Sequence, residues 1–210
     1  MLPKTLNTTV RYFVHMSEKT TITENYFKIL ALFTGGFNKE YYIREVNTIL
    51  KISPDTARLI LGDLERRNVL ESKIRGKIKV YKIKKSNLAK VYLILTENYK
   101  RIKFFEKHFQ IQEIITKISP FIIGLALIFG SYAKGKEKKD SDLDIFIVGN
   151  YDEKQIDNIS EIYGAEINIK NYSVKTFQNN LTKDILIKEV LDNHIVIKGT
   201  EEFIQLIDYD

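Results

Sequence analysis

Two aspartates separated by one residue stand at the start of an apolar run, in the segment "DLDIFIV" at 142–148. The β-branched residues of this run predict a buried strand, and side chains alternate along a strand, so Asp142 and Asp144 are expected on the same face. Two neighbouring carboxylates repel each other unless a cation lies between them. Mg²⁺ binds oxygen ligands, commonly one or two carboxylates together with substrate phosphates. The pair therefore predicts a site for Mg²⁺ or Mn²⁺.

A glycine and a serine end the preceding apolar segment, "FIIGLALIF" at 121–129. This segment has the length and composition of a buried central strand. Gly130 and Ser131 can begin a short helix or turn whose backbone N–H groups, together with the serine hydroxyl, face an anion. We therefore expect the two carboxylates to converge beside a phosphate-binding turn.

The Gly-Ser pair, ten intervening residues and then Asp-Leu-Asp after an apolar strand resemble the signature of the polymerase-β-like nucleotidyltransferase superfamily. The resemblance covers residues 121–170 and is strongest to the minimal bacterial and archaeal members. It implies that Gly130 and Ser131 hold the β- and γ-phosphates of an NTP, with ATP the expected nucleotide, while Lys134 assists. It also implies that Asp142 and Asp144 bind two metal ions for in-line attack of an acceptor hydroxyl on the α-phosphate.

The third carboxylate of that superfamily has no clear counterpart. The next predicted strand is "AEINIK" at 165–170, and its hydrophobic pattern aligns Asn168 with the third acid. Glu166 lies two residues earlier on the same face and could serve as base or metal ligand. Alternatively the acid is lost and the site binds a nucleotide without turnover, because asparagine neither accepts a proton nor neutralises a metal. The sequence thus leaves open whether the protein is an enzyme.

The first part of the chain predicts three helices followed by a β-hairpin. The three helical patterns are "ENYFKILALF" (24–33), "KEYYIREVNTILK" (39–51) and "ISPDTARLILGDLERRN" (52–68). Ser53 is expected to cap the third helix, with Pro54 at its first position. The segment "VLESKIRGKIKVYKI" (69–83) alternates apolar and basic residues around Gly76. This order resembles a winged helix-turn-helix domain over residues 20–86.

Charge favours double-stranded DNA as a partner of this region. Residues 1–120 hold 23 Lys and Arg against 11 Asp and Glu, whereas residues 121–210 hold 10 against 16. A basic helix and wing would contact phosphates or base edges, with affinity falling steeply as salt rises. The residues expected at the DNA are Thr56, Arg58, Arg66, Lys73, Arg75 and Lys77. The alternative is a winged fold that serves for protein docking or dimerisation.

Residues 87–119 predict one long helix or two abutting helices that connect the two parts. Apolar residues recur on one stripe of this segment: Leu88, Val91, Leu95, Ile102, Phe105 and Phe109. Such a stripe either packs across both domains or pairs with its counterpart in a homodimer. Pro120 ends the helical pattern.

Together these features predict a winged-helix domain (20–86), a connecting helix (87–119) and an α/β nucleotidyltransferase domain with a mixed sheet (120–210). No stretch is long and apolar enough to cross a membrane, and the chain has no cysteine, so we expect a cytoplasmic protein without disulfides. One expected function is Mg²⁺-dependent transfer of a nucleoside monophosphate to a hydroxyl. The alternatives are a nucleotide-sensing transcriptional regulator and an antitoxin-type partner of a ribonuclease toxin, because superfamily members include such antitoxins.

Overall fold

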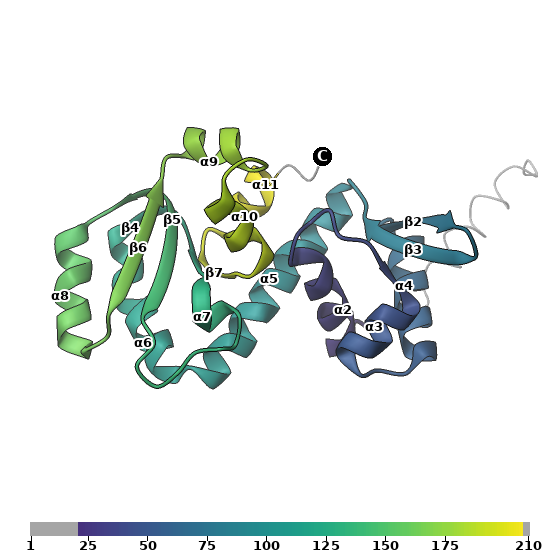
Figure 1. Ribbon diagram of the computed structural model, residues 1–210, viewed down its shortest axis with the longest axis horizontal. Coiled ribbons are helices and arrows are strands. Elements are labelled where there is room, and N and C mark those ends of the chain that lie inside the picture. The colour runs from purple at the N-terminus through teal and green to yellow at the C-terminus, as the bar shows by residue number, and fades with distance from the viewer. Residues whose placement is uncertain (1–20, 208–210) are drawn as a thin grey trace, which may run out of the picture.

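The computed structural model describes residues 21–207 of the 210-residue chain. Figure 1 shows two lobes, a purple-to-blue N-terminal one and a green-to-yellow C-terminal one, with helix α5 running between them. The predicted fold class is confirmed: helices with a small sheet precede a mixed four-stranded sheet with helices. No hydrophobic period is evident in residues 1–22, and nearly all of this segment lies outside the described residues. None of the helices within 21–207 combines the length and the apolar character needed to cross a membrane.

From residue 21 onward, the N-terminal lobe contains three helices and a three-stranded antiparallel sheet of order β1-β3-β2. Its elements are α2 (Glu24–Thr34), β1 (Tyr41–Tyr42), α3 (Ile43–Leu50), α4 (Pro54–Arg66), β2 (Leu70–Arg75) and β3 (Ile78–Ile83). Helix α4 begins as predicted, with the Thr56 amide donating to the Ser53 hydroxyl over 3.1 Å. The second predicted helix starts four residues late, at Ile43. Its first residues instead form β1, because Tyr41 and Tyr42 pair with Tyr81 and Val80 of β3.

The connecting segment forms two helices, α5 (Asn87–Lys107) and α6 (Phe109–Ile118), which meet at His108. Helix α5 does pack across both lobes, contacting α2 on one side and β7 and α11 on the other. The face that does so is not the predicted apolar stripe, however. Its buried residues are Ala89, Tyr92, Leu93, Thr96, Glu97 and Phe104. Most of the predicted stripe lies on the opposite, exposed side of α5.

The C-terminal lobe is built on a sheet of order β6-β5-β4-β7, in which only β5 and β6 run parallel. Its strands are β4 (Ile122–Ile128), β5 (Leu143–Tyr151), β6 (Ile167–Tyr172) and β7 (Ile195–Lys198). Its further helices are η2 (Ser119–Phe121), α7 (Gly130–Ala133), α8 (Glu153–Tyr163), α9 (Val174–Asn180), α10 (Ile185–Asp192) and α11 (Thr200–Leu206).

Alternation along β5 divides the core between the two faces of this sheet. Ile145 and Ile147 pack in one cluster with residues of α6 and α8. Phe146 and Val148 pack in the other cluster, which includes side chains of α9, α10 and α11. Figure 1 shows the same arrangement, with α8 and α9–α11 on opposite sides of the strands. Asp144 shares the Phe146 face, so its side chain projects toward the α10 side.

A buried polar network joins the two lobes. The Lys100 ammonium donates to Glu97 Oε1 over 2.9 Å and to the Thr34 hydroxyl of α2 over 3.3 Å. His194, in the turn before β7, contacts Lys100 Nζ through Nε2 at 3.2 Å and the Val190 carbonyl through Nδ1 at 3.1 Å. The side chains of Glu97 and His194 have no exposed surface. The network therefore ties α2 and α5 to the C-terminal lobe with charged groups.

Candidate functional site

The start of β5 carries both predicted metal-binding aspartates. Asp144 is the second residue of β5, and Asp142 directly precedes the strand. Both residues are partly buried. Burial, and next the charge of Asp142, raise the pKa of the Asp144 carboxyl above its usual value. The two carboxylates are therefore near neighbours, as strand alternation predicts.

Asn168 stands beside this pair on the parallel neighbour β6. It is in register with Asp144, and its amide Nδ2 donates to Asp142 Oδ2 over 3.2 Å. Glu166 precedes β6, and its backbone carbonyl accepts from the Leu143 amide over 2.8 Å while the residue as a whole is exposed. Within residues 21–207, no group of three His, Asp or Glu side chains is placed to hold a metal ion. Asn168 thus contacts the aspartate pair, and Glu166 does not complete a three-carboxylate site with it.

The Gly130-Ser131 turn lies against Asp144. Gly130 follows β4 with a φ of 69°, and a Cβ atom on it would lie 2.1 Å from Asp144 Oδ2. The Phe129 amide donates to the Asp144 carbonyl over 3.0 Å, which fixes the turn beside β5. Helix α7 begins at Gly130 and carries Ser131, which is partly exposed. Only glycine fits at position 130, because a side chain there would displace the carboxylate.

Substituting Gly130 by alanine is expected to displace the Asp144 carboxylate and to abolish Mg²⁺-dependent nucleotide binding. The matched control is Gly135→Ala, because Gly135 has a similar φ of 62° but a Cβ atom added there would meet no atom within 4 Å. Both variants share the strain of a positive φ, roughly 1–3 kcal/mol. Calorimetric titration of ATP with Mg²⁺ should therefore separate them. Equal binding by the two variants would show that Gly130 does not shape the site.

A lysine and a glutamate face each other at the same end of the lobe. Lys134 Nζ lies 2.6 Å from Glu189 Oε1, and both side chains are partly exposed. Glu189, on α10, also contributes to the raised pKa of Asp144, after burial and Asp142. Sequence reasoning missed Glu189, because an acidic residue on the polar side of an amphipathic helix carries no signal of its own. Its place at the site depends on how α10 packs on the sheet.

The aspartate pair fits a divalent cation with its nucleotide. Among the ion pairs of residues 21–207, none joins Asp142 or Asp144 to a lysine, arginine or histidine. Two carboxylates that form no salt bridge, at a partly exposed strand end, are the donor set expected for Mg²⁺. With only two protein carboxylates, substrate phosphates and water would supply the remaining ligands.

The residues predicted at DNA lie on α4 and on the β2–β3 hairpin. Arg58 and Arg66 project from the exposed side of α4, with side chains 64% and 76% exposed, and pair with Asp55 and Asp63. Thr56 forms a hydrogen bond with Ser53 at the start of the helix.

On the hairpin, Lys73 and Arg75 both pair with the partly buried Glu40. Lys77 lies exposed at its tip. Four of the six predicted residues are therefore held by an acidic neighbour within the lobe, and DNA would compete with those carboxylates.

Residues 110–203 match the family described as polymerase beta, nucleotidyltransferase. The C-terminal half therefore carries a nucleotidyltransferase domain of the polymerase β type. The match includes both aspartates, the Gly130-Ser131 turn and Asn168, so the residues that converge in the structure are those of the matched domain.

No curated protein is similar enough to the chain to count as a match. Two solved structures show weak likeness. One is a crystal structure of a toxin-antitoxin with AMP-PNP, 18% identical over 46% of this chain and 77% of that chain, with a TM-score of 0.32. The other is TrmBL2, an archaeal chromatin protein with a novel mode of DNA binding, 13% identical over 86% of this chain and 74% of that chain, with a TM-score of 0.28. Likeness this weak says nothing about function.

Proposed function

We propose that the protein transfers a nucleoside monophosphate from an NTP, with ATP the expected donor, to a hydroxyl group. The observation that carries this proposal is the approach of Asp144, with Asp142 beside it, to Gly130 at the start of α7 within a polymerase β-type domain. Within the described residues, neither acid forms an ion pair with a lysine, arginine or histidine. A metal-bound triphosphate is the ligand that would stabilise this arrangement.

In this mechanism Asp142 and Asp144 hold the metal ions, and the backbone and hydroxyl of Ser131 bind the terminal phosphates. Bound Mg²⁺ would supply charge stabilisation and orient the reacting phosphate. Asn168 keeps Asp142 in place through its amide, but it cannot accept the proton of the acceptor hydroxyl. Lys134 would release Glu189 and turn to the phosphates when a nucleotide enters, since its pairing partner is a partly exposed carboxylate.

The test is incubation of the full chain with each α-labelled NTP and Mg²⁺, using a cell extract to supply the acceptor. We expect label on a protein or RNA from at least one NTP. Ribonuclease toxins are one acceptor class, because the superfamily that this domain resembles includes antitoxins. Tight binding of ATP and Mg²⁺ with no labelled product from any NTP would instead favour a nucleotide sensor.

Restoring a carboxylate at position 168 provides a second test of the chemistry. The Asn168→Asp variant is expected to raise the transfer rate on the order of tenfold, about 1.4 kcal/mol of added transition-state stabilisation, because a third acid would join the pair. Initial rates with labelled ATP measure the effect. Asn150→Asp, at an exposed position of β5, is the control. Slower transfer by Asn168→Asp would mean that the amide contact with Asp142 is needed more than a third charge.

A second function, binding of double-stranded DNA by the N-terminal lobe, is supported by its order of elements. Three helices, a short strand and a hairpin follow the winged-helix pattern, with α4 in the position of the recognition helix. The basic side chains on α4 and the hairpin tip are exposed. Nucleotide binding would then regulate transcription only if the nucleotide prefers one arrangement of the two lobes. Both functions would operate in the cytoplasm.

The double variant Arg58→Ala/Lys77→Ala is expected to weaken binding of double-stranded DNA. The slope of the logarithm of the DNA-binding constant against the logarithm of salt concentration should become shallower by the amount that corresponds to about two phosphate contacts. Fluorescence anisotropy across a salt series measures both quantities. Lys154→Ala, an exposed lysine of α8 in the other lobe, is the control. An unchanged salt slope in the double variant would remove α4 and the wing from the DNA interface.

A further inference from the structure

His108, at the break between α5 and α6, lies against the loop that joins α7 to β5. Its Nε2 atom is 3.5 Å from Glu137 Oε1, and the two side chains are 17% and 24% exposed. Its ring packs edge-on against Tyr132 of α7, with 5.6 Å between the ring centroids, and at a tilt against Phe104, at 4.4 Å. The imidazole therefore contacts both α7 and the loop that follows it.

Glu137 is the one inward-facing residue of residues 134–140, which we call the lysine loop. The other six residues are exposed, and four of them are lysines: Lys134, Lys136, Lys138 and Lys139. Glu137 Oε2 is buried and accepts no hydrogen bond from residues 21–207. A carboxylate in such a place is unfavourable unless a donor or a cation lies beside it. His108 Nε2 can donate an N–H group there, and the imidazole adds a positive charge when it is protonated.

Two hydrogen-bonded turns meet at Glu137. On one side, the Lys136 amide donates to the Ser131 carbonyl over 3.0 Å. On the other side, the Lys138 amide donates to the Ser141 hydroxyl over 2.8 Å, and the Ser141 amide donates to the Lys138 carbonyl over 3.1 Å. The first turn includes the expected phosphate-binding serine, and the second leads directly to the first aspartate of the pair. The position of Glu137 therefore affects how the phosphate-binding turn and that aspartate lie relative to each other.

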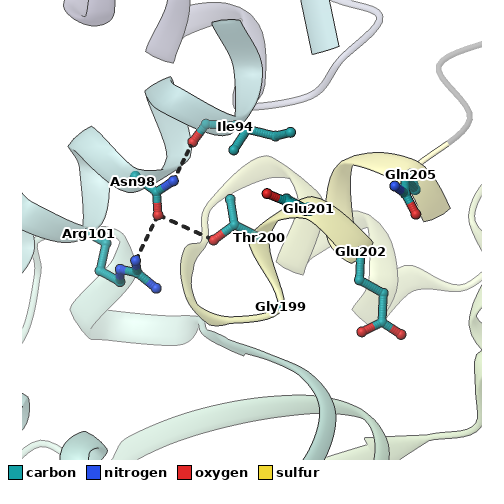
Figure 2. Close-up of a pocket in the computed structure, with 8 residues that line it drawn as sticks. All are labelled: Ile94, Asn98, Arg101, Gly199, Thr200, Glu201, Glu202 and Gln205. Carbon is teal, nitrogen blue, oxygen red and sulfur yellow. Dashed lines mark hydrogen bonds between the residues drawn. The ribbon is translucent and has the colours of Figure 1, made fainter. Parts of the chain in front are cut away.

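Helix α5 gives His108 a fixed support on the C-terminal lobe. Arg101, two turns earlier, donates through Nη1 to the Ile197 carbonyl of β7 over 3.2 Å. Figure 2 shows Asn98 bonded to both Arg101 and Thr200 of α11. Asn98 Oδ1 accepts from Arg101 Nη2 over 2.7 Å and from the Thr200 hydroxyl over 3.5 Å. These contacts hold the second half of α5, and with it the imidazole, independently of the lysine loop.

We propose that His108 is a positioning residue for the nucleotide: by holding Glu137, it keeps the lysine loop beside the phosphate-binding turn and Asp142. The proposal rests on the proposed nucleotidyltransferase function. Without the imidazole nitrogen, the Glu137 carboxylate would turn out to water, and the lysine loop would move with it. A nucleotide then binds only the molecules whose loop is in place, so its apparent affinity falls. Once bound, its phosphates attract the lysines back, and the chemical step keeps its rate.

His108→Phe is the informative variant, because it keeps a ring against Phe104 and Tyr132 but lacks the nitrogen. Calorimetric titration of ATP with Mg²⁺ is expected to give a Kd about tenfold higher than that of the wild type. The KM for the nucleotide should rise equally, with kcat within about twofold of the wild type. His108→Gln, whose amide can donate to Glu137, should restore the affinity. Wild-type affinity in His108→Phe, or a loss confined to His108→Gln, would reduce His108 to a packing role and overturn the proposal.

A double-mutant cycle tests whether the effect passes through Glu137. Glu137→Ala is expected to weaken ATP binding as much as His108→Phe. The double variant should bind no more weakly than either single variant, because each substitution removes the same contact. Asp140→Ala, at an exposed acid of the same loop, is the control. Losses that add in the double variant would show that His108 does not act through Glu137.

Amide hydrogen exchange without nucleotide separates this proposal from the proposed function. The amides of Lys136, Lys138 and Ser141 are expected to exchange faster in His108→Phe than in the wild type, while those of β5 stay unchanged. A wild-type protein that binds no nucleotide would refute the nucleotidyltransferase function, whatever the loop does. Unchanged exchange at these three amides in a folded His108→Phe would refute the holding of the lysine loop by His108.

Discussion

Substituting Asp144 by asparagine is expected to lower the rate of nucleotidyl transfer by about 10³-fold, since losing one metal-binding carboxylate removes roughly 4 kcal/mol of transition-state stabilisation. The substitution keeps the shape of the side chain beside Gly130 and removes only its charge. Single-turnover rates with α-labelled ATP measure the effect. Asp140→Asn is the control, because Asp140 is an exposed acid in the same loop, outside the pair. A rate within tenfold of the wild type would exclude Asp144 from the reaction.

The same substitution should stabilise the protein when no metal is present. Burial and the Asp142 charge raise the pKa of Asp144, so the folded state binds a proton more readily than the unfolded state. Such a group is charged at unfavourable cost near neutral pH, and the cost disappears as the pH falls below the folded pKa. In the absence of metal, Asp144→Asn is therefore expected to raise the melting temperature at pH 7 and to have a smaller effect at pH 4. This opposition between stability and activity is typical of functional carboxylates.

Substituting Glu97 by glutamine is expected to destabilise the fold by about 3 kcal/mol or more, which lowers the melting temperature by roughly 10 °C for a chain of this size. The substitution conserves volume but leaves the mostly buried Lys100 at the junction of the lobes without its counter-charge. Thermal unfolding followed by circular dichroism measures the loss. Glu113→Gln, an exposed position of α6, is the control. Equal melting temperatures of the two variants would mean that the buried network contributes no stability.

The stabilisation that Glu97 provides is expected to decrease at acidic pH. Burial alone would raise the pKa of Glu97, but the charges of Lys100 and His194 outweigh it and lower the pKa from 4.5 to about 2. The stabilisation is therefore fully present above pH 4.5 and is lost as the pH falls toward 2, where the folded carboxylate takes up its proton. The stability difference between the wild type and Glu97→Gln should shrink over that window.

Strand alternation was sufficient to predict that Asp142 and Asp144 share a face, because β5 is a regular strand with a buried run behind it. The start of α4 was also predicted, from the capping residue Ser53 followed by Pro54. The hairpin after it was predicted from the alternation of apolar and basic residues around Gly76. The two-residue strand β1 did not, since Tyr41 and Tyr42 continue a helical pattern and are drawn into the sheet only by pairing with β3. Such pairing depends on residues about forty positions away.

Two further features, the buried face of α5 and the position of Glu189, depend on tertiary packing. Hydrophobic periodicity in the sequence could not predict them. The apolar stripe of α5 was visible in the sequence, but its opposite side is the buried one, because both lobes pack on a face that includes Glu97 and Thr96. Charged residues on a buried face are invisible to a hydrophobic pattern. Glu189 came to the site only through the packing of α10.

Binding of a metal ion by Asp142 and Asp144 beside a triphosphate is the central claim. The most direct test is anomalous scattering from crystals grown with Mn²⁺ and a non-hydrolysable ATP analogue. We expect a Mn²⁺ peak at coordination distance from both carboxylates, with phosphate density next to Gly130 and Ser131. Nucleotide density elsewhere in the molecule, or bound nucleotide with no metal at the two aspartates, would contradict the claim.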